Sequence, residues 1–445
     1  MRPKNILLIN PWIHDFAAYD YWIKPLGLLY LADFLCHHGY QVNLLDCLNS
    51  YTKSNPDGTH RLRSEKISKP NILASIPRHY KRYGLPVQEF TSQLHSLPKP
   101  DLIGLTCLMT YWYPGALKAV KLCRQIYPDI PLVLGGIYPT LCPEHAKSTF
   151  ADLTVCPGSD LLTFLKVIDQ LCQIKRDYTQ IKPDLFNYRP AYDLLEDQST
   201  LAILTSVGCP GKCSYCASHY LQPIFYQRHW TDVYAEIVSY INKSQTQNIA
   251  FYDDALLINQ QTHFKPLLKQ IIRDKQKVQF HLPNGMHIAA LDQELAELMF
   301  QANVRSLRLS FESSDLARQK QSSSKVNNQD LAKAAKLLKA AGFTNEDIEV
   351  YVLCGLPGQS LEEIKQSIDY VHSQGLKVHL ADYSPLPQTP EFAKACQIKP
   401  RLEVEPLLQN NKVFPVLQGE TYYQELLALR SWTKERNQWV GGCGL

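Results

Sequence analysis

Short apolar runs alternate with longer amphipathic stretches over the first 165 residues. Short apolar runs closed by Gly, Pro or polar residues are typical of buried strands, and longer periodic stretches are typical of helices. The predicted strands are 5–11, 41–47, 101–108, 131–136 and 151–158. Predicted helices at 25–39 and 114–128 lie between them, and the polar stretch 49–99 is interpreted as an insertion. This alternation predicts a parallel, doubly wound (Rossmann-like) sheet that binds ligands at the carboxyl ends of its strands.

A second alternating series begins at residue 199. Its predicted strands are 201–207, 249–252, 278–282, 306–311, 348–354 and 377–383. Helices are predicted to start near Thr231, to span 330–342, and to open at Ser360, where Ser360 and Glu363 match a capping box. Six β/α units predict a complete or partial β6/α6 TIM-type barrel with its chemistry at the carboxyl ends of the strands.

These patterns divide the α/β chain into four expected parts. They are a doubly wound domain (1–165), a linker (166–198), the barrel (199–400) and a small C-terminal extension (401–445). A length of 445 residues accommodates two or three domains.

Composition excludes some classes of protein. A net charge of +4 does not indicate a nucleic-acid partner, and we interpret the basic patch "RHYKRYG" (78–84) as a solvated face. No window of about 20 apolar residues predicts a membrane span. The apolar run at the N-terminus is too short for a signal peptide, so a cytoplasmic protein is expected.

Three of the 13 cysteines form a cluster. The stretch "SVGCPGKCSYCASHY" (206–220) spaces Cys209, Cys213 and Cys216 as C-x3-C-x2-C, whereas the others stand apart on mostly apolar stretches. A structural zinc site needs a fourth ligand, and His219 lies at an unusual spacing for one. Inert buried thiols fit poorly in a polar, turn-rich loop. An iron–sulfur cluster with one iron open to a small ligand fits best.

The loop resembles the signature of the radical S-adenosylmethionine (radical SAM) superfamily, C-x3-C-x-aromatic-C, with Tyr215 as the aromatic residue. The resemblance covers about residues 199 to 400. It implies that the three thiolates hold a [4Fe–4S] cluster whose fourth iron binds S-adenosylmethionine. Reductive cleavage then yields a 5′-deoxyadenosyl radical that removes a hydrogen atom from the substrate.

The same resemblance implies S-adenosylmethionine contacts at the strand ends. The residues are Tyr215, Asp253, Asp254, Ser310, Glu312, Gly355 and Gly358. Asp253 or Asp254 would meet the methionyl amine, although Asp254 also suits a helix N-cap. Glu312 and Ser310 would meet ribose and carboxylate. Gly355 and Gly358 would lie near the adenine, and a plain tight turn explains them nearly as well.

The first domain resembles the cobalamin-binding domains attached to many radical SAM enzymes. The motifs are "TCLMT" (106–110), "GGIYPT" (135–140) and "CPGSD" (156–160). They place candidate cobalamin contacts at Thr106, Leu108, Gly135, Gly136, Tyr138 and Gly158. Any nucleotide-binding doubly wound domain also ends strands with glycine, so that alternative stays open.

The histidine motif of cobalt-ligating domains, D-x-H-x-x-G, is missing after the first strand. The corresponding stretch "NPWIHDFAAYDYW" contains His14 without the flanking Asp and Gly. We therefore expect cobalamin to bind without a protein histidine on cobalt. The aromatic run Tyr111, Trp112 and Tyr113 would cover the lower face of the corrin, or else pack a domain interface.

The expected function is a cobalamin-dependent radical SAM methyltransferase that transfers methyl from methylcobalamin to an unactivated carbon. The alternatives are a radical SAM enzyme of another reaction type, such as cyclisation or rearrangement, and an iron–sulfur or corrinoid carrier. The expected partners are a small-molecule or peptide substrate and an electron donor of flavodoxin or ferredoxin type. The sequence assigns no catalytic acid or base.

Overall fold

The computed structural model describes residues 2–323 and 325–440, so the last residues of the expected C-terminal extension, 441–445, lie outside it. The chain forms two compact units. The N-terminal unit comprises Met1–Gln198 and Glu403–Asn410, and the C-terminal unit comprises Ser199–Leu402 and Asn411–Leu445. The expected linker thus lies within the N-terminal unit, together with eight residues of the expected C-terminal extension.

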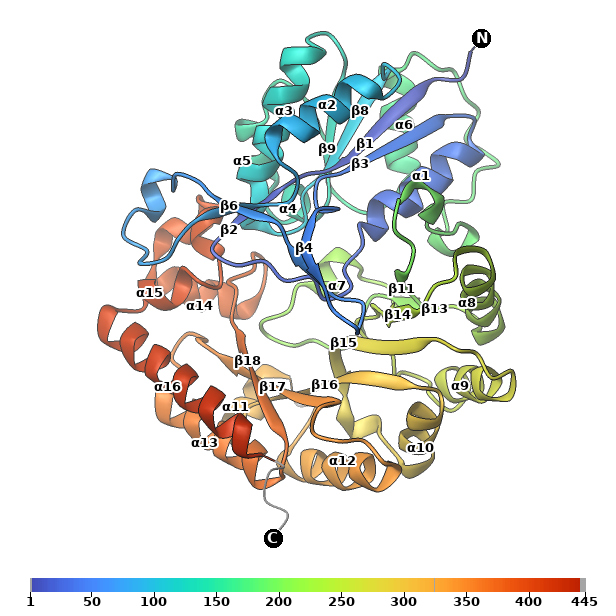
Figure 1. Cartoon of the computed structure of the whole chain (residues 1–445). Helices are drawn as coiled ribbons and strands as arrows, with labels where there is room; N and C mark the ends of the chain where they lie inside the picture. The colour runs from blue at the N-terminus through green and yellow to red at the C-terminus, as the bar shows by residue number, and fades with distance from the viewer. Residues whose placement is uncertain (1, 324, 441–445) are drawn as a thin grey trace. The chain divides into compact units, whose positions relative to one another are not determined.

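A five-stranded parallel sheet forms the centre of the N-terminal unit (Figure 1). Its strands are β1 (Asn5–Asn10), β3 (Gln41–Asp46), β8 (Leu102–Thr106), β9 (Leu132–Gly135) and β10 (Thr154–Val155), in the order β10-β9-β8-β1-β3. The helices α1 (Leu26–His37) and α6 (Leu161–Leu171) pack on one face, and α2 (Val87–Ser96) and α3 (Tyr113–Ile126) pack on the other. The expected doubly wound fold is confirmed, and its strand order reverses between β1 and β8.

The polar stretch 49–99 carries antiparallel pairs as well as α2. They are the hairpin β4 (Tyr51–Ser54) and β5 (His60–Leu62), and the strands β6 (Ser64–Lys66) and β7 (Lys81–Tyr83). The last two form a sheet with β2 (Ile13–Asp15), which lies earlier in the chain, in the order β2-β7-β6. The other helices described before residue 199 are η1 (Asn71–Leu73), η2 (Thr110–Trp112), α4 (Ile137–Leu141), α5 (Pro143–Thr149), η3 (Leu185–Asn187) and η4 (Tyr192–Leu194).

Six parallel strands form the C-terminal unit and pair in chain order. They are β11 (Thr200–Ile203), β14 (Asn248–Phe251), β15 (Gln279–His287), β16 (Val304–Glu312), β17 (Ile348–Cys354) and β18 (Lys377–Asp382). The main covering helices are α8 (Trp230–Ser244), α9 (Phe264–Arg273), α10 (Gln293–Gln301), α12 (Asn328–Ala341) and α13 (Leu361–Ser373). This is the expected partial barrel.

Shorter elements and the C-terminal helices complete this part of the chain. They are β12 (Ser206–Val207), α7 (Ser218–Leu221), β13 (Tyr226–Gln227), η5 (Ile288–Ala290), α11 (Leu316–Ser322), α14 (Pro390–Ile398), η6 (Pro400–Glu403), η7 (Pro406–Gln409), α15 (Phe414–Leu417) and α16 (Glu420–Trp439). Of these, η7 belongs to the N-terminal unit.

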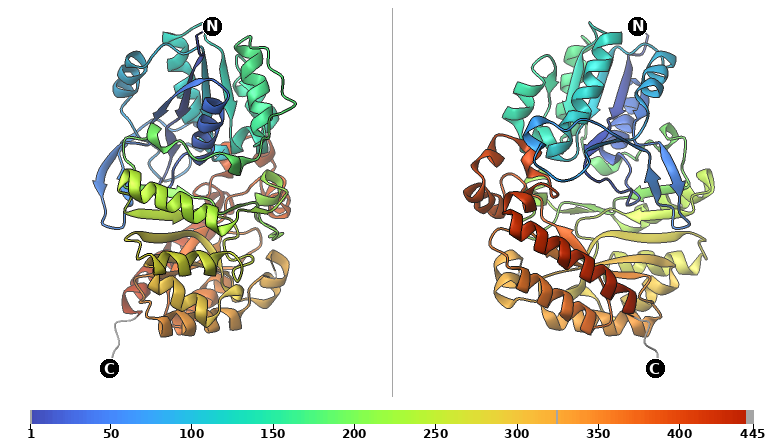
Figure 2. Two further views of the ribbon diagram at one scale, coloured as in Figure 1. Left: turned by 90° about the vertical axis from the view of Figure 1, so that its right-hand side faces the viewer. Right: turned by 60° about the vertical axis from the view of Figure 1, so that its left-hand side comes forward.

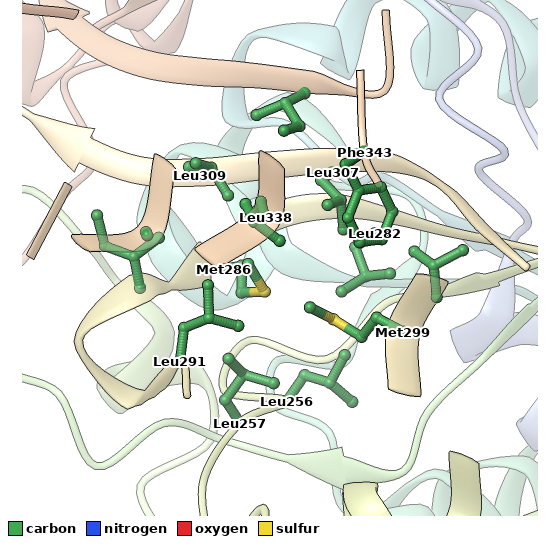
Figure 3. Packing of buried hydrophobic residues seen from close by; sticks show 14 of the residues in the cluster. Leu256, Leu257, Leu282, Met286, Leu291, Met299, Leu307, Leu309, Leu338 and Phe343 are labelled. Atoms are coloured by element: carbon green, nitrogen blue, oxygen red, sulfur yellow. The ribbon is translucent and has the colours of Figure 1, made fainter. Parts of the chain in front are cut away.

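Apolar side chains of the barrel strands pack against those of the covering helices (Figure 3). Leu282 and Met286 of β15 and Leu309 of β16 meet Met299 of α10 and Leu338 of α12. Burial of such side chains stabilises the fold by about 1.5–3 kcal/mol each before entropy is counted. The core therefore supports the strands, and their carboxyl ends remain available for function.

The long helix α16 covers the edge strand β18 and lies along α13 (Figure 2). The Asn437 side chain accepts a hydrogen bond from Val378 N at 2.9 Å and donates one to Val378 O at 2.8 Å. The amide of Asn437 thus satisfies the N–H and C=O groups of one residue at the edge of the sheet, as a neighbouring strand would, and these groups are no longer open to another chain. No helix among residues 2–323 and 325–440 is long and apolar enough to cross a membrane.

Three local expectations differ from the structure. Strand β15 continues past the expected end at 282 to His287, and only Thr154–Val155 of the expected strand 151–158 forms. Ser360 caps α13 as expected, by accepting from Glu363 N at 3.1 Å. The Glu363 carboxylate binds the Arg318 guanidinium instead of completing a capping box.

Candidate active site

The three-cysteine loop follows β11 and β12, at the carboxyl end of the barrel sheet. Ser214 anchors it between Cys213 and Cys216. Ser214 N donates to Ser322 O at 2.7 Å, and Glu391 N donates to Ser214 O at 3.0 Å. The Ser214 hydroxyl also donates to the buried Glu391 carboxylate at 3.1 Å. These contacts fix the backbone that carries the thiols.

The surroundings of the sulfur atoms suit thiolate ligands. Gly211 N donates to Cys209 Sγ and Ser218 N donates to Cys216 Sγ, both at 3.4 Å. A Cβ atom at Gly211 would lie 3.3 Å from Cys209 Sγ and 4.0 Å from Cys213 Sγ, so a glycine leaves the space beside both sulfurs open. Hydrogen bonds to the sulfurs and solvent exposure tune iron–sulfur clusters. The donor set, the N–H donors and the open space fit a [4Fe–4S] cluster.

No three His, Cys, Asp or Glu side chains in the described part of the chain converge on one point as ligands of a single ion. An iron–sulfur cluster instead takes each thiolate on a different iron atom.

Lys325 supplies positive charge beside the loop. Burial raises the pKa of the Cys209 and Cys213 thiols, and the Lys325 ammonium opposes that shift. Burial also disfavours the charged form of Lys325, but Glu312 and the thiols outweigh it and raise the pKa of Lys325. The lysine therefore stays protonated and stabilises the thiolate forms.

Glu312 links the cysteine loop to this lysine. Its carboxylate accepts from the Tyr215 hydroxyl and from Ser323 Oγ, and it lies 3.1 Å from Lys325 Nζ. Glu312 ends β16 at a register shift and has φ of 74°, a left-handed conformation that costs a non-glycine residue energy. Strain of this kind persists only where the surroundings hold it, and it aims the carboxylate at the loop.

Replacing Tyr215 with phenylalanine should weaken this link. Glu312 is buried, so losing a hydroxyl donor leaves its carboxylate less satisfied, and we expect a loss of roughly 1–3 kcal/mol of stability. Chemical unfolding of the protein would measure it. Tyr220→Phe, at an exposed tyrosine four residues from Cys216, is the matched control. Equal stability of the two variants would contradict the proposed link.

The two candidate aspartates after β14 lie in different surroundings. Asp253 is buried, and its carboxylate accepts from Thr205 N at 3.0 Å, Thr205 Oγ1 at 2.7 Å and Ser206 Oγ at 2.6 Å. Burial raises the pKa of Asp253, and these donors oppose it. Asp253 thus fixes the start of the cysteine loop. Asp254 is exposed as a residue, but desolvation of its carboxyl group raises its pKa, and the Ser218 hydroxyl opposes that shift.

The other candidate contacts lie at the ends of β16 and β17. Ser310 fills the space beside Gly285 of β15, where a Cβ atom would lie 2.1 Å from Ser310 Oγ. Gly355 and Gly358 have φ of 89° and 70°, which favours glycine. The Gln418 side chain donates to Gly355 O at 2.9 Å, and Arg318 donates to Gly358 O at 3.3 Å.

A pocket opens in the N-terminal unit where the strand order reverses. It encloses about 870 Å³, counting its open mouth, at the carboxyl ends of β1, β3 and β8. Such a crevice is the usual ligand site of a doubly wound sheet. Of the predicted cobalamin contacts, it brings together Thr106, Leu108 and Trp112. The remaining five, Tyr111, Gly135, Gly136, Tyr138 and Gly158, are not among the residues that line it.

The glycine pair lies at the end of β9. A Cβ atom at Gly136, whose φ is 103°, would lie 2.7 Å from Thr106 Oγ1 and from Cys107 O. At Gly135 it would lie 2.8 Å from the Phe164 ring. These glycines thus let the backbone pack closely behind Thr106, which lines the pocket. The polar strand ends, the closely packed glycines and the open mouth of the pocket suit a ligand that extends out of it, as a bulky cofactor such as cobalamin would.

The aromatic candidates separate into core and pocket residues. Tyr138 is fully buried, and its hydroxyl pairs with His145 Nδ1 at 2.7 Å. Tyr111 is also buried, whereas Trp112 reaches the pocket. Gly158 is exposed, and Gly158 N donates to Thr140 Oγ1 at 2.9 Å. His14 lies in β2, where burial lowers its pKa to about 4, and it is not among the pocket residues.

Sequence reasoning missed several residues of these sites. Asn10 and Asp46 end β1 and β3, line the pocket, and form a hydrogen bond of 2.7 Å. Their positions at the carboxyl ends of two predicted strands could have identified this pair as candidate ligand contacts. Lys325 and Glu391 lie far from the cysteine motif in sequence, and no local pattern marks them.

Comparison with known families matches both units. The Radical SAM superfamily model matches residues 203–371, and the B12 binding domain model matches residues 81–165. The chain therefore contains a radical SAM domain. More particularly, it carries a B12-binding domain ahead of that radical SAM domain.

Individual relatives share low sequence identity with this chain, but the matches cover most of its length. Cytidylyl-2-hydroxyethylphosphonate methyltransferase of Streptomyces wedmorensis is 21% identical over 443 residues, which covers 84% of this chain and 78% of the relative. Among solved structures, the radical S-adenosylmethionine methyltransferase TsrM of Kitasatospora setae has a TM-score of 0.63 at 16% identity. That match covers 88% of this chain and 76% of TsrM.

Proposed function

We propose that the protein is a cobalamin-dependent radical SAM enzyme that methylates an unactivated carbon. The observation that carries the proposal is the three-cysteine loop at the barrel mouth in a chain that also has a B12-binding domain. The named relatives support it, because both are methyltransferases and TsrM has been solved with cobalamin and a [4Fe–4S] cluster bound.

In this proposal, Cys209, Cys213 and Cys216 hold the cluster. The cluster, with bound S-adenosylmethionine, would supply a 5′-deoxyadenosyl radical. The protein contributes position: Ser214 anchors the loop, and Glu312 and Lys325 set the charge beside it. Of the two aspartates, Asp254 has the more accessible carboxylate for the methionyl amine, because Asp253 already receives the donors of Thr205 and Ser206.

The remaining proposed contacts to S-adenosylmethionine follow the strand ends. They are Tyr215, Ser310, Glu312, Gly355 and Gly358. An ionised carboxylate has about four acceptor positions, and the contacts of Glu312 with Tyr215, Ser323 and Lys325 leave one for a ribose hydroxyl.

Cobalamin is proposed to occupy the N-terminal pocket without a histidine ligand to cobalt, and it would supply the methyl group. Thr106, Leu108 and Trp112 would contact it directly. Gly135 and Gly136 would act by close backbone packing, and a large cofactor against backbone is a common use of glycine at strand ends. Tyr111, Tyr138 and Gly158 would support the surrounding loops.

The substrate is proposed to be a small molecule or a peptide, and electrons are proposed to come from a flavodoxin or ferredoxin. The relatives differ in substrate, since one is named for a cytidylyl phosphonate and the TsrM structure contains tryptophan. Both facts support a small organic substrate, and neither selects one.

The absorption spectrum of the purified, anaerobically reconstituted protein tests the proposal. We expect iron–sulfur absorbance in the protein alone, and added bands of tightly held cobalamin after incubation and gel filtration. Loss of all cobalamin on gel filtration would contradict the proposed binding of cobalamin. Cluster and cobalamin binding without cleavage of S-adenosylmethionine would favour a carrier protein.

A further inference from the structure

Residues 403–410, here called the C-terminal strap, follow the barrel in sequence but fold with the N-terminal unit. Helix η7 of the strap packs against η2, which follows β8. Glu405 accepts from the Tyr113 hydroxyl at 3.2 Å, and Gln409 is fully buried. The strap is therefore an integral part of the cofactor-binding unit, although the family match to that unit ends at residue 165.

Asn410 at the end of the strap reaches a buried carboxylate. Asp15, the last residue of β2, is only 4% exposed. Its Oδ1 accepts from Asn410 Nδ2 at 2.8 Å and from Phe16 N at 2.6 Å, and its Oδ2 accepts from Trp112 Nε1 at 2.7 Å. Within the described residues, no Lys, Arg or His nitrogen forms an ion pair with Asp15, so these neutral donors hold the carboxylate in place.

Trp112 connects this carboxylate to the pocket. Neither Tyr111 nor Tyr113 is among the lining residues, so Trp112 alone brings the aromatic run to the pocket wall. Its single N–H donor is committed to Asp15, which fixes the plane of the indole ring. A continuous series of hydrogen bonds thus runs from Asn410 through Asp15 to the wall of the pocket.

We propose that Asn410 and Asp15 are positioning residues that hold Trp112 against the corrinoid, so that the C-terminal strap completes the cobalamin site. The inference rests on the proposed function, because it assigns the pocket to cobalamin. It adds that a segment 395 residues from Asp15 controls the affinity of that pocket. The binding unit is therefore complete only in a chain that continues past the barrel.

The test measures the dissociation constant of hydroxocobalamin for the full-length protein. Asn410→Leu keeps the size of the side chain but removes the donor. The indole ring is then less ordered before binding and must be immobilised on binding, so we expect the dissociation constant to rise about tenfold. Glu403→Gln, at an exposed position of the same strap, is the control and should bind as wild type does.

A double-mutant cycle separates positioning from general support. Trp112→Phe keeps an aromatic ring but cannot donate to Asp15, so it should weaken binding by itself. If Asn410 acts through Trp112, adding Asn410→Leu to Trp112→Phe should cost little more. Additive effects would overturn the proposal, and so would an unchanged dissociation constant in Asn410→Leu.

Two further outcomes are distinguishable. If wild type binds no hydroxocobalamin, the proposed function of the pocket fails and the inference fails with it. If wild type binds but Asn410→Leu does not fold, as judged by thermal unfolding, the smaller Asn410→Ser change takes its place. Its dissociation constant must then rise relative to Glu403→Gln, and equal values would overturn the inference.

Discussion

Cys213→Ala is expected to abolish the cluster, reducing protein-bound iron and sulfide to background and eliminating cleavage of S-adenosylmethionine. The reason is the ligand count, since a cluster on three thiolates has no protein ligand to spare. Cys213 is also buried within the loop that Ser214 anchors, so its loss leaves an apolar gap beside the remaining sulfurs.

The matched control for this variant is Cys36→Ala, because Cys36 is an exposed, isolated thiol in α1 of the N-terminal unit. It should retain wild-type iron and sulfide. Iron and visible absorbance in Cys213→Ala equal to those of the control would show that the three-cysteine loop does not hold a cluster.

Gly136→Ala is expected to cost roughly 2–5 kcal/mol of stability and to abolish tight cobalamin binding. Two effects add. The φ of 103° is unfavourable for alanine, and the new Cβ atom would lie 2.7 Å from both Thr106 Oγ1 and Cys107 O. Backbone atoms cannot move aside cheaply, so the end of β8, which lines the pocket, must shift.

Gly158→Ala separates the two effects. Its φ of 94° is similar, but no atom lies within 4 Å of its Cβ position, so only the conformational cost of about 1–2 kcal/mol remains. Thermal or chemical unfolding and a cobalamin titration would measure both variants. Equal losses in the two would mean that close packing behind Thr106 is unimportant.

The sequence predicted both folds well because periodicity is a local signal that burial enforces. It failed where a neighbouring strand overrides local preference. The expected strand ends at 282, before Pro283-Asn284-Gly285, yet β15 continues through this run to His287 with a register shift between Leu282 and Met286. Ser310 of β16 fills the space that Gly285 leaves, and the Asn284 side chain donates to Tyr252 O at 2.9 Å. Tertiary contacts of this kind are invisible to a single-sequence pattern.

The same distinction applies to the sites. Cys209, Cys213 and Cys216 form a compact motif whose spacing is itself the signal, and strand ends marked Thr106 and Trp112. By contrast, Lys325 meets Glu312 across a loop, and Asn410 meets Asp15 from the far end of the chain. Such pairs arise only once the elements fold together.

The claim that this protein is a cobalamin-dependent radical SAM methyltransferase is tested most directly by measuring two reaction products together. The reconstituted protein, supplied anaerobically with cobalamin, a strong reductant and S-adenosylmethionine, is analysed for 5′-deoxyadenosine and S-adenosylhomocysteine. A cobalamin-dependent radical SAM methyltransferase should form both, and the homocysteine product should depend on added cobalamin. Formation of 5′-deoxyadenosine alone would contradict methyl transfer, and formation of neither would contradict the radical SAM assignment of the cysteine loop.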